Sequence, residues 1–151
     1  MLELDEIFYA ALMANETIVS DTDRRIFSTC VEVPPTETDN TPLPYIIIMD
    51  EGLQNDQGTK DNVWESIEDR VQASVMVNAI SPKEVKRLTR IVRKAIADYI
   101  ATMEGNRPYL QSLTTDGTAW DPTKPCYYKT LVYQCDVTNT NDDEQESNSD
   151  I

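Results

Sequence analysis

The sequence predicts an α+β fold: a single domain with a mainly antiparallel sheet and two helices packed on one face. Several short runs alternate apolar and polar residues, as strands do, and one long run has the periodicity of a helix. Three of the strand-like runs precede that helix and one or two follow it, an order typical of a meander with helices on one face. A chain of 151 residues can bury a sizeable single core.

The first part of the chain is predicted to form one helix and two strands. Apolar residues recur three and four positions apart over residues 2–14, which predicts a short amphipathic helix. Residues 25–33 alternate as a strand does, with Phe27 on one face and Ser28 on the other. A proline-rich loop over 34–44 leads to 45–49, a continuous apolar run that is typical of a strand buried on both faces.

The middle of the chain is predicted to contain a long loop and the clearest strand. Residues 50–69 carry seven acids against Lys60 alone, and we expect an acidic loop there. Residues 70–80 then alternate regularly. The apolar face of this strand consists of Val71, Ala73, Val75, Val77 and Ala79.

A long helix follows this strand. Ser81 is a natural N-cap, Pro82 suits the first helical position, and Glu84 completes a capping box. The apolar stripe predicts that the helix runs to about Glu104, and Gly105 is the expected stop.

The last part of the chain is predicted to hold an edge strand, a loop and a closing strand. Residues 108–114 are the expected edge strand, and 115–125 a turn-rich loop that contains Trp120. Residues 127–137 alternate as a strand does, although Lys129 interrupts the apolar face.

The chain therefore divides into a domain over residues 1–137 and a tail over 138–151. The tail is acidic and poor in apolar residues, which predicts disorder.

Composition argues against several function classes. The formal net charge is -14, from 27 acids and 13 Lys+Arg, which disfavours a general nucleic-acid binder or an anionic membrane surface. No apolar run approaches the roughly 18 residues of a membrane span. There is no histidine, which removes the commonest general base and metal ligand, and the four glycines form no phosphate-binding motif.

We therefore expect no catalytic, cofactor-binding or metal site. A carboxylate-based hydrolase is the weakest alternative, because no spacing marks a pair of carboxylates. The three cysteines, Cys30, Cys126 and Cys135, lack a C-x-x-C pair, and we expect inert thiols.

The long helix carries the first candidate contact site. Six of the 13 cations lie on it, and a 4-3-4 spacing places Lys83, Arg87, Arg90 and Lys94 along one side. The interpretations are a solvated polar face, a contact with a neighbouring subunit, or a contact with nucleic-acid phosphate. The candidate contact residues of this helix are Lys83, Lys86, Arg87, Arg90, Arg93 and Lys94.

The acidic segment 50–69 is the second candidate. Asp56, Asp61 and Trp64 are its expected contact residues, in an arm that would meet a basic helix of another subunit. The alternatives are a plain flexible loop and a cation site, although the spacing does not match the EF-hand calcium loop.

In their order and their patterns of apolar and polar residues, the predicted elements resemble the tail completion, or tail terminator, proteins of long-tailed bacteriophages. The resemblance covers roughly residues 1–137. It rests on the run 44–48 after a proline-rich loop, on the strand 69–77 that leads directly into the helix around 84–96, and on the closing strand 128–137. The insertion over 109–125 and the acidic tail depart from the pattern.

The resemblance implies a virion protein of the phage tail or neck, assembled in the host cytoplasm, that is not an enzyme. Such proteins form a ring, typically a hexamer, that caps the tail tube and joins it to the head connector. The implied partners are other copies of the chain, the tail tube protein, the connector or head-closure protein, and DNA that passes through the lumen. Another head–tail connector or minor tail protein, and a small adaptor that binds one partner through its basic helix, are the alternatives.

Overall fold

The structure is a computed structural model of the chain. It describes residues 4–28, 42–55, 68–105, 107–114, 117–122 and 125–138. The acidic tail beyond Thr138 and the predicted contact residues Asp56, Asp61 and Trp64 lie outside these ranges.

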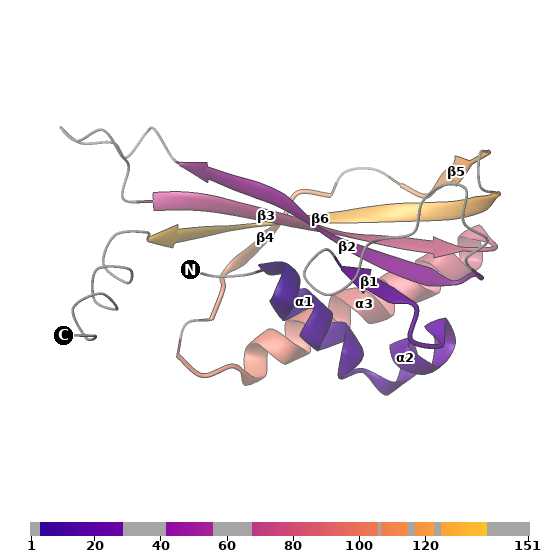
Figure 1. The fold of residues 1–151 in the computed structure, drawn as a ribbon, viewed down its shortest axis with the longest axis horizontal. Coiled ribbons are helices and arrows are strands. Elements are labelled where there is room, and N and C mark those ends of the chain that lie inside the picture. The colour runs from indigo at the N-terminus through magenta and orange to yellow at the C-terminus, as the bar shows by residue number, and fades with distance from the viewer. Residues whose placement is uncertain are drawn as a thin grey trace.

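The described residues form a sheet with three helices on one of its faces (Figure 1). The predicted α+β class is confirmed, with a mixed, mostly antiparallel sheet of six strands. The helices are α1 (Leu4–Met13), α2 (Glu16–Thr22) and α3 (Pro82–Thr102). The strands are β1 (Ile26–Ser28), β2 (Tyr45–Asn55), β3 (Glu68–Ala79), β4 (Leu110–Ser112), β5 (Ala119–Asp121) and β6 (Cys126–Thr138).

Helix α2 is a helix that the sequence pattern did not predict. Asn15 begins it, because its side-chain Oδ1 accepts a hydrogen bond of 3.0 Å from the backbone N–H of Ile18. The helix ends after two turns, with Asp23 in the left-handed conformation at φ 51°. A helix this short shows no clear apolar periodicity, and a third helix therefore joins the two that were predicted.

The strands lie in the order β1-β2-β3-β6-β4, and β5 also pairs with β6. Every pairing is antiparallel except that of β1, which runs parallel to β2 with Ile26 opposite Ile46. The prediction of a meander is therefore wrong at the first strand. Within β1, Phe27 and Ser28 lie on opposite faces as predicted, and the buried face is that of Ile26 and Ser28, whereas Phe27 is half-buried.

The second strand extends beyond its predicted bounds. Residues 50–55, which were predicted to belong to a loop, extend β2 and pair with residues 69–73 of β3, as far as Asn55 opposite Asp69. Residues 68–69, also predicted to belong to the loop, extend β3 and pair with the end of β6. Backbone pairing does not require apolar side chains, so these acidic strand ends lack the apolar alternation from which a strand is predicted. In the predicted part of β2, Ile46 and Ile48 are fully buried but Ile47 is half-buried, since the helices cover only one face.

The central strands confirm the predicted alternation. Val75 pairs with Leu131, and both side chains are buried under the helices. Tyr133 packs its ring edge-on against Phe8 of α1 at 5.2 Å between centroids. Cys126 and Cys135 of β6 are buried thiols, whereas Cys30 lies outside the described residues.

Helix α3 confirms the most detailed prediction. The Ser81 hydroxyl accepts a hydrogen bond of 3.2 Å from the backbone N–H of Glu84, and Pro82 occupies the first turn. The helix ends at Thr102, and Gly105 follows with a left-handed φ of 81°. The core-facing stripe is fully or almost fully buried and includes Val85, Leu88, Val92 and Ile96.

The segment after α3 forms the free edge of the sheet. Strand β4 confirms the predicted edge strand and pairs with β6. Strand β5 lies where a loop was predicted, and Trp120 pairs with Tyr127 with 4.7 Å between ring centroids. No helix in the described segments is long and apolar enough to cross a membrane.

Candidate functional site

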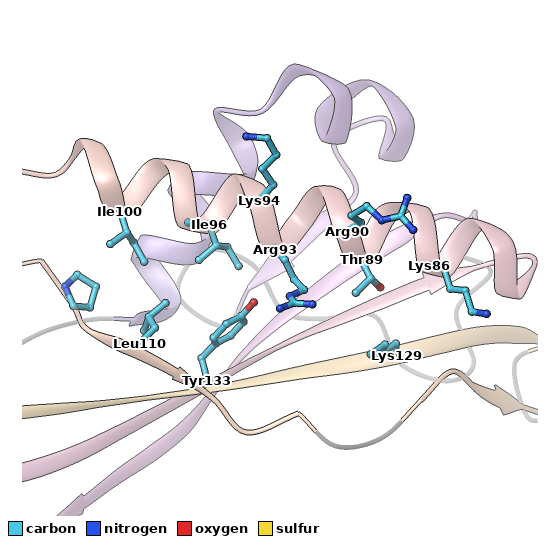
Figure 2. A pocket seen from close by; sticks show the side chains of 12 residues that line it. Lys86, Thr89, Arg90, Arg93, Lys94, Ile96, Ile100, Leu110, Lys129 and Tyr133 are labelled. Atoms are coloured by element: carbon cyan, nitrogen blue, oxygen red, sulfur yellow. The ribbon is translucent and has the colours of Figure 1, made fainter.

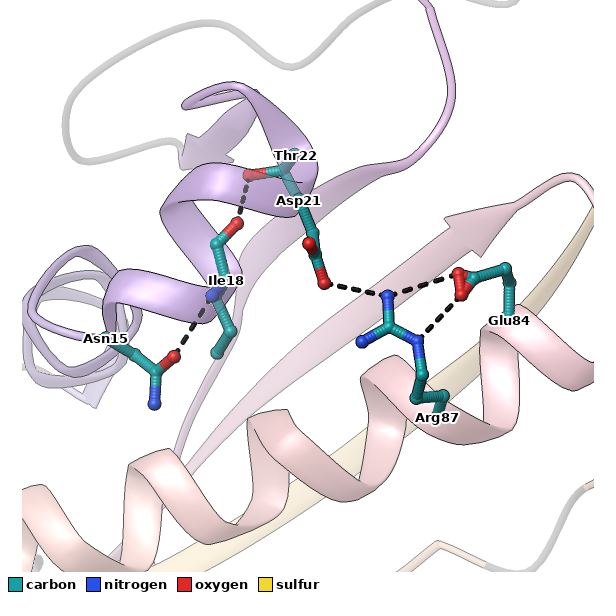
Figure 3. Close-up of polar contacts among 6 residues, drawn as sticks. All are labelled: Asn15, Ile18, Asp21, Thr22, Glu84 and Arg87. Atoms are coloured by element: carbon teal, nitrogen blue, oxygen red, sulfur yellow. Dashed lines mark hydrogen bonds and ion pairs between the residues drawn. The ribbon is translucent and has the colours of Figure 1, made fainter.

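The structure divides the basic residues of α3 between two flanks of the helix. One flank faces α2, and the other faces β6 and β4 (Figures 2 and 3). Lys83, on the first turn, takes part in neither the ion pairs of Arg87 nor the lining of the groove. The 4-3-4 spacing therefore did not identify one common surface.

Arg87 lies on the flank that faces α2. Its guanidinium donates to Asp21 of α2, with 2.7 Å between Nη2 and Oδ2, and to Glu84, with 2.7 Å between Nε and Oε1 (Figure 3). This predicted contact residue is thus engaged within its own chain.

The electrostatics of this flank follow from the same three groups. The hydrogen bond from Arg87 holds the pKa of the Glu84 carboxyl below its usual range. The hydrogen bonds to Glu84 and then to Asp21 raise the pKa of the Arg87 guanidinium. Two carboxylates therefore outnumber the one cation, and no positive charge is left over for a partner.

The opposite flank of α3 borders an open groove of about 730 Å³ (Figure 2). Helix α3 forms one wall, and β6 together with the segment around β4 forms the other. One end of the groove is cationic and the other is apolar. The cationic residues along it are Lys86, Arg90, Arg93, Lys94 and Lys129.

Four of these five cations have no carboxylate partner among the described residues. No ion pair in the described ranges involves Lys86, Arg90, Arg93 or Lys129. Lys94 differs, because its Nζ lies 2.9 Å from Asp98 one helical turn away. The groove therefore carries uncompensated positive charge inside a molecule of net charge -14.

Thr89 adds an unsatisfied polar group to this wall. Its residue is only 6% exposed, and within the described part of the chain its Oγ1 has no hydrogen-bond partner. Its side chain points from α3 toward β6, between Lys86 and Arg93 (Figure 2). A buried hydroxyl without a partner is costly, and this one can donate to an anion in the groove.

Tyr133 lies in the middle of the groove floor. Burial raises the pKa of its phenol, although the neighbouring charge of Arg93 and a hydrogen bond with it act in the opposite direction. The Arg93 side chain points toward the Tyr133 hydroxyl in Figure 2. Arg93 is thereby held over β6, at the point where the cationic end meets the apolar end.

The apolar end lies beside the second half of α3. Ile96 is buried, whereas Ile100 and Leu110 are half-buried and face each other across the groove (Figure 2). Pro108 closes this end. A segment with carboxylates on one side and apolar atoms on the other would match both ends.

The groove joins part of the predicted set to residues that the prediction missed. Lys86, Arg90, Arg93 and Lys94 were predicted and lie together. Thr89, Lys129 and Tyr133 were not predicted as contact residues. The signal for one of them was present, because Lys129 interrupts an otherwise apolar strand face, and a lysine there requires an opening between helix and sheet.

The described residues offer no metal centre. No group of three or more His, Cys, Asp or Glu side chains that could hold an ion occurs among them. The groove instead presents cations, one hydroxyl donor and apolar side chains, which suits non-covalent binding of an acidic partner.

Comparisons with known proteins find similarity at the level of structure. No protein-family model and no curated protein matches the sequence. Among solved structures, the chain is similar to one from the virion of a native gene transfer agent particle, with a TM-score of 0.53 and 15% sequence identity. The similarity covers 89% of this chain and 93% of the other. At this identity the likeness concerns the fold.

Proposed function

We propose that this protein is a structural component of a phage-like virion, where it forms a ring at the head–tail junction. The observation that carries the proposal is the fold similarity to a virion chain, which extends over nearly the full length of both proteins. The resemblance of the element order to tail terminators supports the same role.

In this role the ring caps the tail tube and joins it to the head connector. The partners are other copies of the chain, the tail tube protein, the connector and DNA that passes through the lumen. The protein acts by assembly and not by catalysis. The excess of 27 acids over 13 cations suits such a lumen, because DNA phosphates would find few cations to bind.

Neighbouring subunits would meet through opposite charges. The groove flank of α3 supplies Lys86, Arg90 and Arg93. The acidic segment between β2 and β3 of the neighbour supplies Asp56, Asp61 and Trp64. Two different surfaces that bind each other make a head-to-tail contact, and such contacts close into rings when the rotation allows.

Imaging and light scattering of the purified full chain at low and high salt test this proposal. We expect rings at low salt that dissociate as salt screens the contact, and incorporation of the protein into tailed particles. Arg90→Glu should abolish both, whereas Lys83→Glu, which changes an exposed cation outside the groove, should not. Particles that assemble normally without the protein would contradict the proposed function.

A small adaptor that binds a single protein partner is the second candidate. The observation that favours it is the position of the uncompensated cations, which lie in one groove on one flank of α3. A stable 1:1 complex with another protein, lost in Arg90→Glu and formed without rings, would support the adaptor over the ring.

A further inference from the structure

The two ends of the groove differ in their chemistry. Its cationic end lies beside the first half of α3, with Lys86 and Thr89, and Lys129 faces them from β6. Its apolar end lies beside Ile100 and Leu110. The cations therefore favour an anion at the end of the groove beside the first half of α3.

We propose that this groove is a binding site for a short run of carboxylates, and that its occupant is the acidic segment 142–146 of the same chain. This segment has the sequence Asp-Asp-Glu-Gln-Glu. The contact would join an end of the chain that lies beyond β6 to the helix that covers the sheet.

Charge complementarity is the first argument. Residues 138–151 contain five acids and no Lys or Arg. The groove contains four cations without a carboxylate partner among the described residues, and the Thr89 hydroxyl has no acceptor there. Hydrogen bonds from cations to carboxylates are the strong ones, and these four groove cations make no such bond among the described residues.

The acidic segment can also reach the groove from the end of β6. Strand β6 ends at Thr138, and Tyr133 and Lys129, which both line the groove, precede that end by five and nine residues. A segment that turns back beside β6 advances roughly 3.3 Å per residue, as the strand does. Because the turn itself uses residues, residue 146 comes level with Thr130 at the furthest and residue 142 with Gln134. The carboxylates of 142–146 can therefore reach the middle of the groove around Tyr133 and Arg93, where its cationic half begins.

The lining of the groove explains why the acidic segment suits it better than nucleic acid does. The groove closes at one end with the apolar side chains of Ile96, Ile100 and Leu110, which offer a phosphate backbone nothing to bind. The exposed acids elsewhere in the chain repel a polyanion as long as a duplex. A short acidic peptide on a covalent tether meets neither obstacle, and its tether keeps it at about millimolar effective concentration.

A consequence for assembly rests on the proposed function. If the neighbour's acidic surface uses the same groove, the chain's own acidic segment competes with it. Neutralising the segment should then lower the protein concentration at which rings form.

The test compares the full chain with a full-length variant, Asp142→Asn/Asp143→Asn/Glu144→Gln/Glu146→Gln. In two-dimensional NMR spectra of the monomer, we expect the chemical shifts of Thr89 and of the Arg90 and Arg93 side chains to differ between the two chains. These differences should not depend on protein concentration. A fluorescent peptide of residues 139–150 should bind the variant about tenfold more tightly than the unmodified chain, because the tethered competitor is gone.

Further variants control the interpretation. Lys86→Gln/Arg90→Gln in the neutralised chain should abolish peptide binding, whereas Lys83→Gln, which removes one exposed cation outside the groove, should preserve it. Circular dichroism confirms that each variant folds. Peptide binding is measured on the monomer, so it succeeds or fails independently of ring formation.

Three results would overturn the proposal. Identical spectra and equal peptide affinities for the two chains would show that the segment does not occupy the groove. Spectral changes that grow with protein concentration would assign the occupant to a second copy. Binding of a short DNA duplex at the groove, without peptide binding, would assign the site to phosphate.

Discussion

Both flanks of α3 carry basic residues, but the two sets differ in whether they have carboxylate partners within the described residues. On the flank toward α2, Arg87 donates to Asp21 and Glu84 and is neutralised within the chain. On the flank toward β6, Lys86, Arg90 and other cations line an open groove with no carboxylate partner among the described residues. Residues three positions apart on one helix therefore differ completely in what they are free to bind.

The difference comes from what packs beside each flank. Helix α2 presents Asp21 to Arg87, so that flank is closed by a contact within the domain. Strand β6 presents a cation, Lys129, to the other flank, and the described residues that line the groove include no Asp or Glu. A basic surface available for binding is thus defined by the neighbouring element and not by the helix itself.

Weakening the packing of α3, the helix that carries both flanks, should have the largest effect on stability. Leu88 is fully buried between α3 and the sheet, and Leu88→Ala should lower the free energy of unfolding by about 3 kcal/mol through lost burial and a cavity. Urea denaturation measures it. Ile80→Ala is the control, since Ile80 is 74% exposed and should change stability little. An equal effect of both changes would contradict this packing.

Removing the cation of the closed flank should have the next largest effect. Arg87→Gln should cost about 1 kcal/mol near neutral pH, because Asp21 and Glu84 lose their shared donor and the pair is partly exposed. Lys83→Gln, one turn earlier and exposed, should cost less.

The same contact gives a pH dependence of defined sign. The pKa of Glu84 is lowered in the folded chain, so its stabilising contribution is present above the usual carboxyl pKa and is lost as pH falls through the lowered value. The gap between the chain and Arg87→Gln should therefore close in acid, as measured by urea denaturation across pH. A gap that persists in acid would assign the effect to packing of the Arg87 side chain instead.

The sequence predicted the elements with strong periodicity and missed those held by pairing alone. Helix α3 and strands β3 and β6 have regular apolar faces, and each lies where it was expected. Strand β5 is three residues long and is defined by hydrogen bonds to β6, which no local pattern reveals. The parallel pairing of β1 likewise depends on a distant partner, β2.

The site was predicted in part for a related reason. Helical spacing identified which cations lie on α3, but the fate of each depends on residues distant in sequence, such as Asp21 for Arg87 and Lys129 for the groove. Thr89 gave no signal at all, because a threonine in a helix normally bonds a preceding carbonyl or faces solvent. Its unpartnered hydroxyl is visible only in the folded chain.

A smaller effect is expected from the groove hydroxyl. In the chain with residues 142–146 neutralised, Thr89→Val keeps the shape of the side chain and removes a buried group without a partner in the described residues, so it should stabilise that chain by about 0.5 kcal/mol. Thr102→Val is the control, because the Thr102 hydroxyl donates to the Tyr99 carbonyl at 2.7 Å and is exposed. A clear loss of stability in Thr89→Val would mean that the hydroxyl is satisfied in solution.

The smallest stability effect should come from the groove cations, although they define the open flank. In the chain with residues 142–146 neutralised, Lys86→Gln/Arg90→Gln should change the free energy of unfolding by less than about 0.5 kcal/mol, since neither cation has a carboxylate partner in the described residues. Urea denaturation beside Arg87→Gln at the same low salt makes the comparison direct. If the double change cost as much as Arg87→Gln, both flanks would be closed within the chain, and the groove would have no charge left to offer a partner.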